Sequence, residues 1–473
     1  MSSRYLALDL GAESGRAMLA TLADHRIHLE ELHRFPNTPV RLPNGLYWDT
    51  LRLFHEICEG IRASSKAVDR LDGIAIDTWG VDFGLLDADG ALIENPRHYR
   101  DARTNGLAEE VFRIVPKEEI FTNTGTQFME INSLYQLYSI AQRTPALLRN
   151  ASKLLFMPDL FNYFLTGVQC SERTIASTSQ FYNPATRTFC TDMLRKLGIP
   201  GSFLAELVDP GTSLGGVLPH ISEHLGLRYD PVVYTTGCHD TASAVAAVPA
   251  RVGSNWCYIS SGTWSLMGAE LKTPVMNSSA LAANVTNEVG VGNRIRLLKN
   301  IAGLWVLQEC RRAWATEGHE YSYAQLIEMA SNAKPMATVL DLDEFVAPGH
   351  HPGRIQEYCR KTSQQIPDGA GSTVRVILYS LAVRYKAVME TLEALTNRKV
   401  DVIHIVGGGS KNRLLNQLAA DVTGCTVVAG PSEATAAGNA LTQAMGAGEI
   451  TDLEEVREVV RRSFEVEEFR PRR

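Results

Sequence analysis

The sequence predicts an α/β protein made of two related halves. Short apolar runs, typical of buried strands, alternate with segments of helical periodicity, and this alternation indicates helices layered on β-sheets. A glycine-containing hairpin opens the chain, and a second hairpin of similar pattern follows roughly 250 residues later. The chain has 473 residues, which is enough for two large domains. The two hairpins alone would also fit halves that are unrelated.

The first half begins with a predicted hairpin. Residues 5–10 form an apolar run that predicts a buried strand, residues 11–15 predict a turn, and residues 16–22 predict the returning strand. Further along, the pattern predicts strands at 73–76 and 232–234, and helices at 51–63, 133–142, 146–154 and 241–247.

The second half repeats this order. Residues 256–260 predict a strand, 261–263 a turn and 264–270 the returning strand. Apolar residues from Val374 to Leu395 recur at helical spacing and predict a long helix that ends near Asn397. After this helix we expect strands at 402–406 and 426–429, a turn at 407–409, and helices at 411–422 and 434–445. A boundary near residues 244–253 divides the chain into predicted domains of residues 1–246 and 247–473.

Composition and charge exclude several classes of protein. Hydrophobic residues make up 45% and charged residues 21%, as is typical of a folded globular chain. The net charge of −7 argues against broad binding to nucleic acid or to anionic membranes. No apolar run reaches the about 18 residues that span a bilayer, and charged residues interrupt the start where a signal peptide is apolar. We therefore expect a cytoplasmic protein without nucleic-acid or membrane partners, and the sequence leaves its protein partners open.

The first turn carries a candidate anion site in the segment DLGAESGR, residues 9–16. Its glycines allow backbone N–H groups to approach an anion closely, Ser14 adds a hydroxyl donor and Arg16 adds a positive charge. Asp9 is a candidate ligand for Mg²⁺ through water, because this cation prefers oxygen ligands. An ordinary hairpin turn with a surface arginine explains the same residues.

Two further turns precede predicted helices. The triple glycine at residues 407–409 leaves bare backbone on which a nucleotide could pack at a helix N-terminus, although a turn that needs positive φ would also use glycine. In the segment GCHD, residues 237–240, Asp240 is interpreted as the N-cap of the next helix or as a base facing a ligand. One residue can serve both purposes.

A fourth segment has the chemistry of sugar binding. The segment IDTWGVDF, residues 76–83, interleaves polar Asp and Thr residues with Trp79 and Phe83. Sugar hydroxyls need hydrogen-bond donors and acceptors, and sugar C–H faces pack on aromatic rings. A strand with Trp79 in the core is an equally good interpretation.

Together these segments resemble the FGGY carbohydrate kinases of the actin-like, sugar-kinase and Hsp70 superfamily, although the tetrapeptide FGGY itself does not occur. The similarity runs in the family's order through DLGAESGR (9–16), IDTWGVDF (76–83), YRDARTNG (99–106), HDTASAV (239–245), YISSGTWSLMG (258–268), LAANVTNE (281–288), LKNIAGLWVLQ (298–308) and HIVGGGSKN (404–412). The resemblance implies two ribonuclease-H-like domains that face a deep cleft. The first domain would bind sugar and carry the first phosphate turn, and the second would bind the nucleotide.

The resemblance also implies an activity. The segments are most similar to family members that transfer the γ-phosphoryl group of ATP to O1 of L-rhamnulose and release ADP, in L-rhamnose degradation. Mg²⁺ would accompany ATP. A kinase for L-fuculose, L-ribulose, L-xylulose or another polyol remains an alternative, as does a non-enzymatic actin-like protein that binds ATP.

The family's site residues carry over onto matching positions of this sequence. Asp240 matches the catalytic base. The positions expected to contact the sugar are Gly80, His239, Asp240, Thr241 and Asn300, and those expected to contact ATP are Ala12, Glu13, Ser14, Gly15, Arg16, Thr263, Gln308 and Gly408. Glu13 departs from the pattern, because an acid repels phosphate, and we expect its side chain to point away from the nucleotide.

Overall fold

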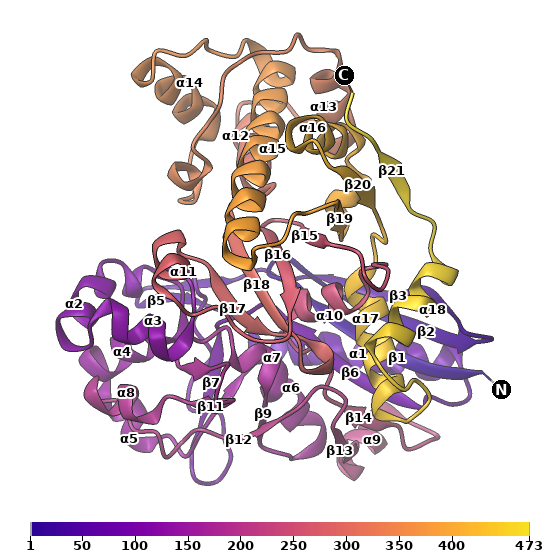
Figure 1. Ribbon diagram of the computed structural model, residues 1–473. Coiled ribbons are helices and arrows are strands. Elements are labelled where there is room, and N and C mark those ends of the chain that lie inside the picture. The colour runs from indigo at the N-terminus through magenta and orange to yellow at the C-terminus, as the bar shows by residue number, and fades with distance from the viewer. Residues whose placement is uncertain (1, 473) are drawn as a thin grey trace. The chain divides into compact units, whose positions relative to one another are not determined.

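The computed structural model describes residues 2–472, and the chain forms two compact units (Figure 1). The first unit comprises the residues up to Pro249 together with Glu270–Leu297 and Ala434–Ser463. The second comprises Ala250–Ala269, Leu298–Glu433 and the residues from Phe464 onward. The chain first changes unit within the boundary region that the sequence predicts. It later returns twice to the first unit, so neither unit is one continuous segment.

The first unit is built on a six-stranded sheet in which the predicted opening hairpin is present. Strand β1 pairs with β2 in antiparallel orientation and with β6 in parallel orientation. Because β2 already begins at Ser14, the turn is shorter than the sequence predicts. In sheet order the strands are β13 (Ser213–Gly216), β14 (Val232–Tyr234), β6 (Gly73–Thr78), β1 (Ser3–Leu10), β2 (Ser14–Ala23) and β3 (Arg26–Pro36).

A seven-stranded sheet repeats this pairing. Strand β15 pairs with β16 in antiparallel orientation and with β19 in parallel orientation, as β1 does with β2 and β6. This equivalence confirms two related halves, each opening with a hairpin. In sheet order the strands are β17 (Thr286–Val289), β18 (Ile295–Ile301), β16 (Ser265–Leu271), β15 (Trp256–Ser261), β19 (Val402–Val406), β20 (Thr426–Ala429) and β21 (Glu467–Phe469).

Helices flank both sheets, and most predicted helices are confirmed. Those of the first unit are α1 (Thr50–Ala67), η1 (Ala102–Thr104), α2 (Leu107–Ile114), α3 (Lys117–Thr124), α4 (Ser133–Arg143), α5 (Pro145–Asn150), α6 (Met157–Thr166), α7 (Arg173–Ala176), α8 (Thr191–Lys196), α9 (Pro219–Leu225), α10 (Asp240–Ala246), α11 (Ser278–Ala283), η2 (Val291–Asn293), α17 (Ala434–Gly446) and α18 (Leu453–Ser463). Those of the second unit are α12 (Trp305–Thr316), α13 (Tyr323–Asn332), η3 (Leu342–Phe345), α14 (His351–Lys361), α15 (Gly369–Thr396), η4 (Gly408–Lys411) and α16 (Arg413–Thr423).

The helix predicted at 146–154 is wrong at its end. Helix α5 stops at Asn150, and strand β8 begins at Lys153 and pairs with β7. The apolar run at 154–156 fits either a helix or a strand, and its partner strand, distant in sequence, decides between them. The four two-stranded sheets are β4 (Val40–Leu42) with β5 (Gly45–Tyr47), β7 (Phe83–Leu86) with β8 (Lys153–Phe156), β9 (Cys170–Glu172) with β12 (Glu206–Val208), and β10 (Tyr182–Asn183) with β11 (Thr188–Phe189).

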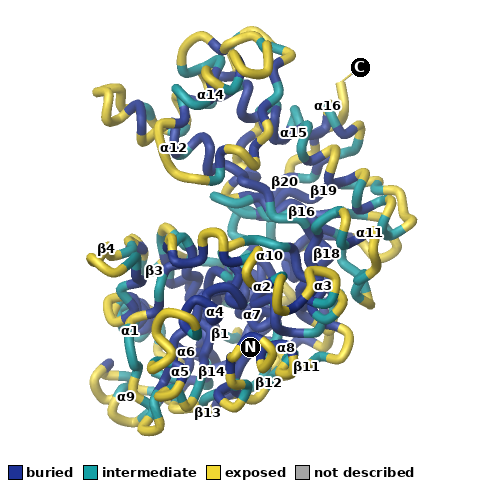
Figure 2. Tube along the Cα trace, turned by 90° about the vertical axis from the view of Figure 1, so that its left-hand side faces the viewer, coloured by how far each residue is buried: buried dark blue, intermediate teal, exposed yellow. Residues whose placement is uncertain are grey.

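The two faces of β1 have different partners. Leu6, Leu8 and Leu10 pack in one buried cluster with residues of α1, whereas Ala7 packs with Ala436 of α17 on the other face. Because side chains alternate along a strand, Asp9 shares its face with Ala7. The buried strands form the dark core of Figure 2. This alternation therefore directs Asp9 toward the face that α17 covers.

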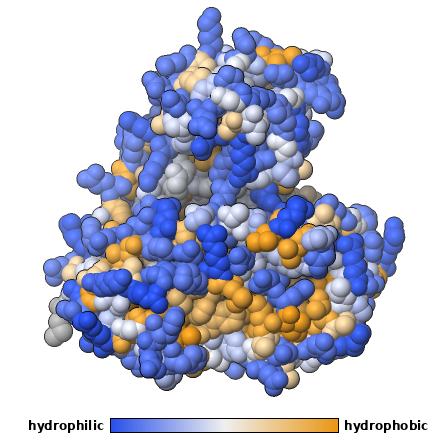
Figure 3. All heavy atoms as spheres, turned by 180° about the vertical axis from the view of Figure 1, so that it is seen from behind, coloured by the Kyte–Doolittle hydropathy of each residue, from blue (hydrophilic) through white to orange (hydrophobic). Residues whose placement is uncertain are grey.

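Hydrophilic side chains dominate one face of the molecule. Figure 3 shows hydrophilic side chains over much of the face seen from behind, with the largest group of hydrophobic side chains in the lower part of the view. Within the part of the chain that the structure describes, no helix combines the length and the apolar character that crossing a membrane requires.

Candidate active site

Acidic side chains of the first unit gather where β1 and β6 end. Asp9 and Asp77 are register partners on these parallel strands, so they lie side by side on one face of the sheet. The next residue of β6, Thr78, forms a parallel bridge with His239, and its N–H donates to the Cys238 carbonyl at 2.9 Å. This bridge brings the segment that leads into α10, and with it Asp240, to the same edge of the sheet.

Asp77 is a functional candidate that sequence reasoning missed. Its carboxyl is fully buried, Oδ2 accepts a hydrogen bond of 2.6 Å from Asn439 of α17, and Oδ1 has no partner among the described residues. Burial raises the pKa of Asp77 well above its usual range, and the negative charges of Asp9 and Asp240 raise it further. The sequence places Asp77 directly after the strand predicted at 73–76, but the pairing that brings it beside Asp9 appears only in the structure.

The predicted phosphate turn has a different structural basis from the one that the sequence indicates. Arg16 Nη2 lies 2.5 Å from Asp9 Oδ2, so its charge is directed at this carboxylate. Gly15 belongs to β2, and a Cβ there would lie 2.2 Å from the Phe35 ring, so packing alone requires this glycine. Asn37 donates to the Gly11 carbonyl at 2.9 Å, and Glu13 is exposed. The turn is therefore stabilised by Phe35 of β3 and by Asn37, which follows β3.

Asp240 is the first residue of α10 rather than its N-cap, a position that His239 occupies. Asp240 Oδ1 accepts hydrogen bonds from Thr241 N–H at 2.5 Å and from the Thr241 hydroxyl at 3.0 Å. His239 Nε2 also lies near this oxygen, 3.3 Å from Oδ1, and the side chain is 30% exposed. Burial raises the pKa of Asp240, His239 opposes this effect, and Asp9 adds to it. One oxygen is thus fixed, and the other is available to a ligand.

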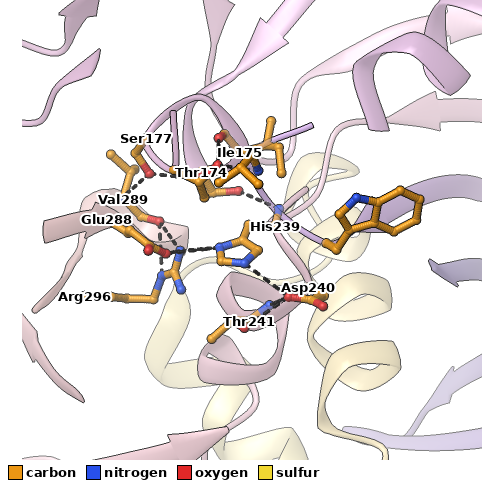
Figure 4. A network of polar contacts seen from close by, with 12 residues as sticks. Thr174, Ile175, Ser177, His239, Asp240, Thr241, Glu288, Val289 and Arg296 are labelled. Carbon is orange, nitrogen blue, oxygen red and sulfur yellow. Dashed lines mark hydrogen bonds and ion pairs between the residues drawn. The ribbon is translucent and has the colours of Figure 1, made fainter. Parts of the chain in front are cut away.

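The backbone that presents His239 and Asp240 is tied to a buried carboxylate. Glu172 accepts hydrogen bonds from Cys238 N–H at 3.2 Å and from Thr174 N–H at 2.8 Å. The hydroxyl of Thr174 in turn accepts from His239 N–H at 3.1 Å. Figure 4 shows the resulting network, in which the imidazole of His239 lies between Glu288 and Asp240.

The segment of residues 76–83, which the sequence associates with sugar binding, contains a second buried carboxylate, Asp82. Asp82 accepts hydrogen bonds from the indole N–H groups of Trp48 at 2.6 Å and Trp79 at 3.0 Å, and from Gln136 Nε2 at 2.9 Å. Burial raises the pKa of Asp82 to about 6 despite these donors. Trp79 is only 5% exposed, so it lies in the core as the second interpretation has it, although it follows the end of β6 instead of lying within a strand. Phe83, at the start of β7, is also buried.

Gly80 lies in a tightly held backbone segment. A Cβ at this position would lie 3.2 Å from the Thr178 side chain. The next residue, Val81, has φ of 69°, an unfavourable value for a β-branched residue. Val81 N–H donates to Thr178 Oγ1 at 3.0 Å, and the Val81 carbonyl accepts from the Ser133 hydroxyl. Such strain persists only where the surroundings enforce it, and it is typical of functional sites.

In the second unit, the predicted nucleotide residues Thr263 and Gln308 are brought together. Gln308 Nε2 donates to Thr263 Oγ1 at 3.4 Å, and Trp305 N–H donates to the Thr263 carbonyl at 3.0 Å. A Cβ at Gly303, whose φ is 53°, would lie 2.5 Å from the Trp264 backbone. The loop before α12 therefore packs directly against the turn between β15 and β16.

The triple glycine adjoins the same strand, and its members have different constraints. Gly407 has φ of 81°, and a Cβ at Gly409 would lie 2.0 Å from Ser261 Oγ at the end of β15. Gly408 has neither constraint, because its φ is not positive and no described atom lies within 4 Å of such a Cβ. Its exposed backbone is therefore open to a flat ligand. Asn300 lies on β18 in the second unit, apart in sequence from the other predicted sugar contacts, and is partly buried.

The residues present fit a hydrated divalent cation better than a cation held by protein alone. Asp9 and Asp77 offer adjacent carboxylates, and Asp77 Oδ1 lacks a partner among the described residues. No group of three or more ligating side chains arises within residues 2–472. Mg²⁺ is commonly bound through one or two carboxylates, with water and phosphate oxygens completing its shell.

Comparison with known proteins places this chain in the FGGY family of carbohydrate kinases. Residues 4–247 match the N-terminal domain of the family and residues 257–447 match the C-terminal domain. The chain belongs to this family and is a phosphotransferase with the two-domain actin-like ATPase fold, rather than a non-enzymatic relative of actin.

Curated relatives cover the chain from end to end. A rhamnulokinase of Bacteroides thetaiotaomicron is 42% identical over 100% of this chain and 96% of its own length. A rhamnulokinase of Bacillus subtilis is 38% identical over 99% of this chain and 95% of its own.

Solved structures show the same fold at low sequence identity. A gluconate kinase of Lactobacillus acidophilus has a TM-score of 0.81 at 14% identity, covering 100% of this chain and 94% of its own. A glycerol kinase of Plasmodium falciparum, solved with ADP, has a TM-score of 0.78 at 15% identity, covering 99% and 94%.

Proposed function

We propose that the protein transfers the γ-phosphoryl group of ATP to O1 of L-rhamnulose, giving L-rhamnulose 1-phosphate and ADP, in L-rhamnose degradation. Full-length relatives named rhamnulokinase, 42% and 38% identical, support the substrate. The reaction would take place in the cytoplasm, where ATP is available. The observation that carries the chemistry is Asp240, whose Oδ1 is fixed by Thr241 while the side chain stays 30% exposed.

In this proposal Asp240 aligns the O1 hydroxyl and accepts its proton. A carboxylate with a usual pKa near 4 is far less basic than an alkoxide, so the proton moves late in the transfer and positioning is the larger contribution. The raised pKa of Asp240 brings it closer to that of an alcohol, which favours acceptance. Gly80, His239, Thr241 and Asn300 are proposed to surround the sugar.

The remaining predicted residues are proposed to bind ATP. Phosphoryl transfer depends mainly on alignment and on offsetting negative charge. The turn residues Ala12, Glu13, Ser14, Gly15 and Arg16 would contact phosphates from the first unit, with Thr263, Gln308 and Gly408 contacting the nucleotide from the second. Mg²⁺ would shield the phosphate charge when bound, with Asp9 and Asp77 as its protein ligands, directly or through water.

The test measures ADP release with Mg-ATP and four ketoses: L-rhamnulose, L-fuculose, L-ribulose and L-xylulose. We expect the highest kcat/KM with L-rhamnulose, and the product should carry phosphate on O1 by ³¹P NMR. A higher kcat/KM with another ketose would reassign the substrate, and ADP release with none would overturn the proposal.

The variant Asp240→Asn tests the base. We expect kcat to fall by about 10²–10⁴-fold while circular dichroism and thermal unfolding stay close to those of the wild type. A kcat within a factor of about three of the wild type, in a folded variant, would remove Asp240 from this role.

A further inference from the structure

Behind His239 lies a fully buried charge pair that the proposed reaction does not use directly. Arg296 of β18 is 0% exposed, and its Nη2 lies 3.0 Å from Glu288 Oε2 of β17. Arg296 Nε and Nη2 also donate to the Val289 carbonyl at 3.2 and 3.1 Å. A buried ion pair is weak evidence for stability, because removing both charges from water is costly. The pair contacts His239, and His239 contacts the candidate base Asp240, so the position of the pair calls for another explanation.

The pair touches only one nitrogen of the His239 ring. Nδ1 lies 3.2 Å from Arg296 Nη2 and 3.1 Å from Glu288 Oε2, whereas Nε2 lies 3.3 Å from Asp240 Oδ1 (Figure 4). An imidazole nitrogen that accepts a hydrogen bond carries no hydrogen, and in the neutral ring the hydrogen then lies on the other nitrogen. Arginine can only donate and a carboxylate can only accept, so the two contacts of Nδ1 call for opposite roles. Glu288 Oε2 makes no hydrogen bond among the described residues, and this favours Nδ1 as the acceptor from Arg296.

We propose that Arg296, anchored by Glu288 and the Val289 carbonyl, is a positioning residue that fixes His239 with its hydrogen on Nε2, directed at Asp240 Oδ1. Asp240 Oδ1 then has three donors, two from Thr241 and one from His239. The carboxylate is held in one rotamer, and Oδ2 is left for the sugar hydroxyl. The inference rests on the proposed function, since that function gives Asp240 its role.

The alternative arrangement shows why Arg296 matters. Without the guanidinium, Glu288 is the only charged group of the pair that faces Nδ1, and it can only accept. The ring would then carry its hydrogen on Nδ1, and the lone pair of Nε2 would face the Asp240 carboxylate. Repulsion between these two acceptors would move the carboxylate away from its aligned position.

The first test is spectroscopic and is made on the wild-type protein, so its result does not depend on whether an Arg296 variant folds. The ¹⁵N signals of the imidazole rings are recorded at about pH 8, where histidine is normally neutral, and His239→Gln identifies the His239 signals by their loss. We expect Nε2 to carry the hydrogen and Nδ1 to carry none. A hydrogen on Nδ1 of the wild-type protein would overturn the proposal.

Kinetics of Arg296→Met provide the second readout. We expect the hydrogen to appear on Nδ1, and kcat to fall by about tenfold or more with little change in KM for ATP. Arg296→Lys, which keeps a charged donor, should restore part of kcat. A folded Arg296→Met with the kcat of the wild type would also overturn the proposal.

The matched control is Arg457→Met. Arg457 is another buried arginine of the same unit, 3% exposed, and its Nη2 lies 2.6 Å from Glu270 Oε2. We expect a similar loss of thermal stability without a change in kcat or in the His239 signals. Equal loss of kcat in both variants would show a merely structural effect. Failure of the proposed function is distinguishable, since the wild type would then release no ADP or Asp240→Asn would remain active.

Discussion

Among the glycines of the turn at 407–409, Gly408 is the one at which a Cβ would meet no described atom within 4 Å and φ is not positive. A substitution at this residue can therefore test nucleotide binding without disturbing the fold. Gly408→Ala should leave the free energy of unfolding unchanged within about 0.5 kcal/mol, because a Cβ meets no described atom. If the nucleotide packs there, KM for ATP should rise by about threefold to tenfold, which corresponds to about 1 kcal/mol of lost contact. Steady-state kinetics and urea unfolding measure the two quantities. An unchanged KM would remove Gly408 from the nucleotide site.

Asp82 shows how a single buried carboxylate can organise several aromatic residues. All its described partners are donors, so Asp82→Asn would place an amide N–H against an indole or against Gln136. We expect a loss of about 2–4 kcal/mol in the free energy of unfolding, measured in urea at pH 7. The control is Asp87→Asn, a partly buried turn residue whose Oδ1 accepts from the N–H groups of Asp89 and Ala91. The asparagine oxygen can still accept these bonds, so we expect a loss below about 1 kcal/mol. Equal losses in both variants would contradict the role given to Asp82.

At the scale of elements, the carboxyl ends of β1 and β6 place Asp9 beside Asp77, and burial together with the charge of Asp9 raises the pKa of Asp77. Asp77→Asn removes the buried charge, and the new side-chain carbonyl can still accept from Asn439. We expect the free energy of unfolding at pH 7 to stay the same or increase, while kcat falls by at least about tenfold because one of the proposed Mg²⁺ ligands is lost. A variant that is less stable but fully active would show that Asp77 is structural.

Sequence patterns predicted elements best where local periodicity is strong. The hairpin of β1 and β2, the long helix α15 and the alternation from β19 to α17 follow from apolar spacing. Helix α15 ends at Thr396 with Asn397 as its C-cap, which confirms the predicted end near Asn397. The strand β3 was missed, because most of its residues are polar and exposed or partly buried, so its sequence carries little of the alternation that predicts a strand. The end of α5 was missed because pairing with β7 decides the state of residues 153–156.

The residues of the candidate site also fall into those that local sequence patterns predicted and those that they did not. Asp240, His239 and the glycine turns carry recognisable local patterns, so sequence reasoning reached them. Asp77, Glu288 and Arg296 act through strand register and through contacts between segments distant in sequence, and no local pattern reports such contacts. For Gly15 the pattern was found but the physical reason differs, because the Phe35 ring rather than an anion excludes a side chain.

At the scale of the whole molecule, buried carboxyl groups should make stability depend on pH. Burial raises the pKa of Glu172 from 4.5 to about 7 and that of Asp82 from 3.8 to about 6. Between about pH 4 and pH 7 the unfolded chain therefore releases protons that the folded chain keeps, so these two groups lower the free energy of unfolding as pH rises. For Glu172 the full change is about 3 kcal/mol, at about 1.4 kcal/mol per pKa unit.

The variant Glu172→Gln isolates this contribution from that of every other titrating group. Urea unfolding of both proteins at pH 5, 6, 7 and 8 gives the difference in the free energy of unfolding at each pH. We expect the free energy of unfolding of the wild type to fall relative to that of the variant as pH rises from 5 to 8. Only the wild type has a carboxyl group at this position, which must either ionise while buried or keep its proton at a pH where the unfolded chain has lost it. The lost hydrogen bonds to Thr174 and Cys238 shift the difference by a constant and leave its slope unaffected. A difference that is independent of pH would show that Glu172 titrates normally in the folded protein.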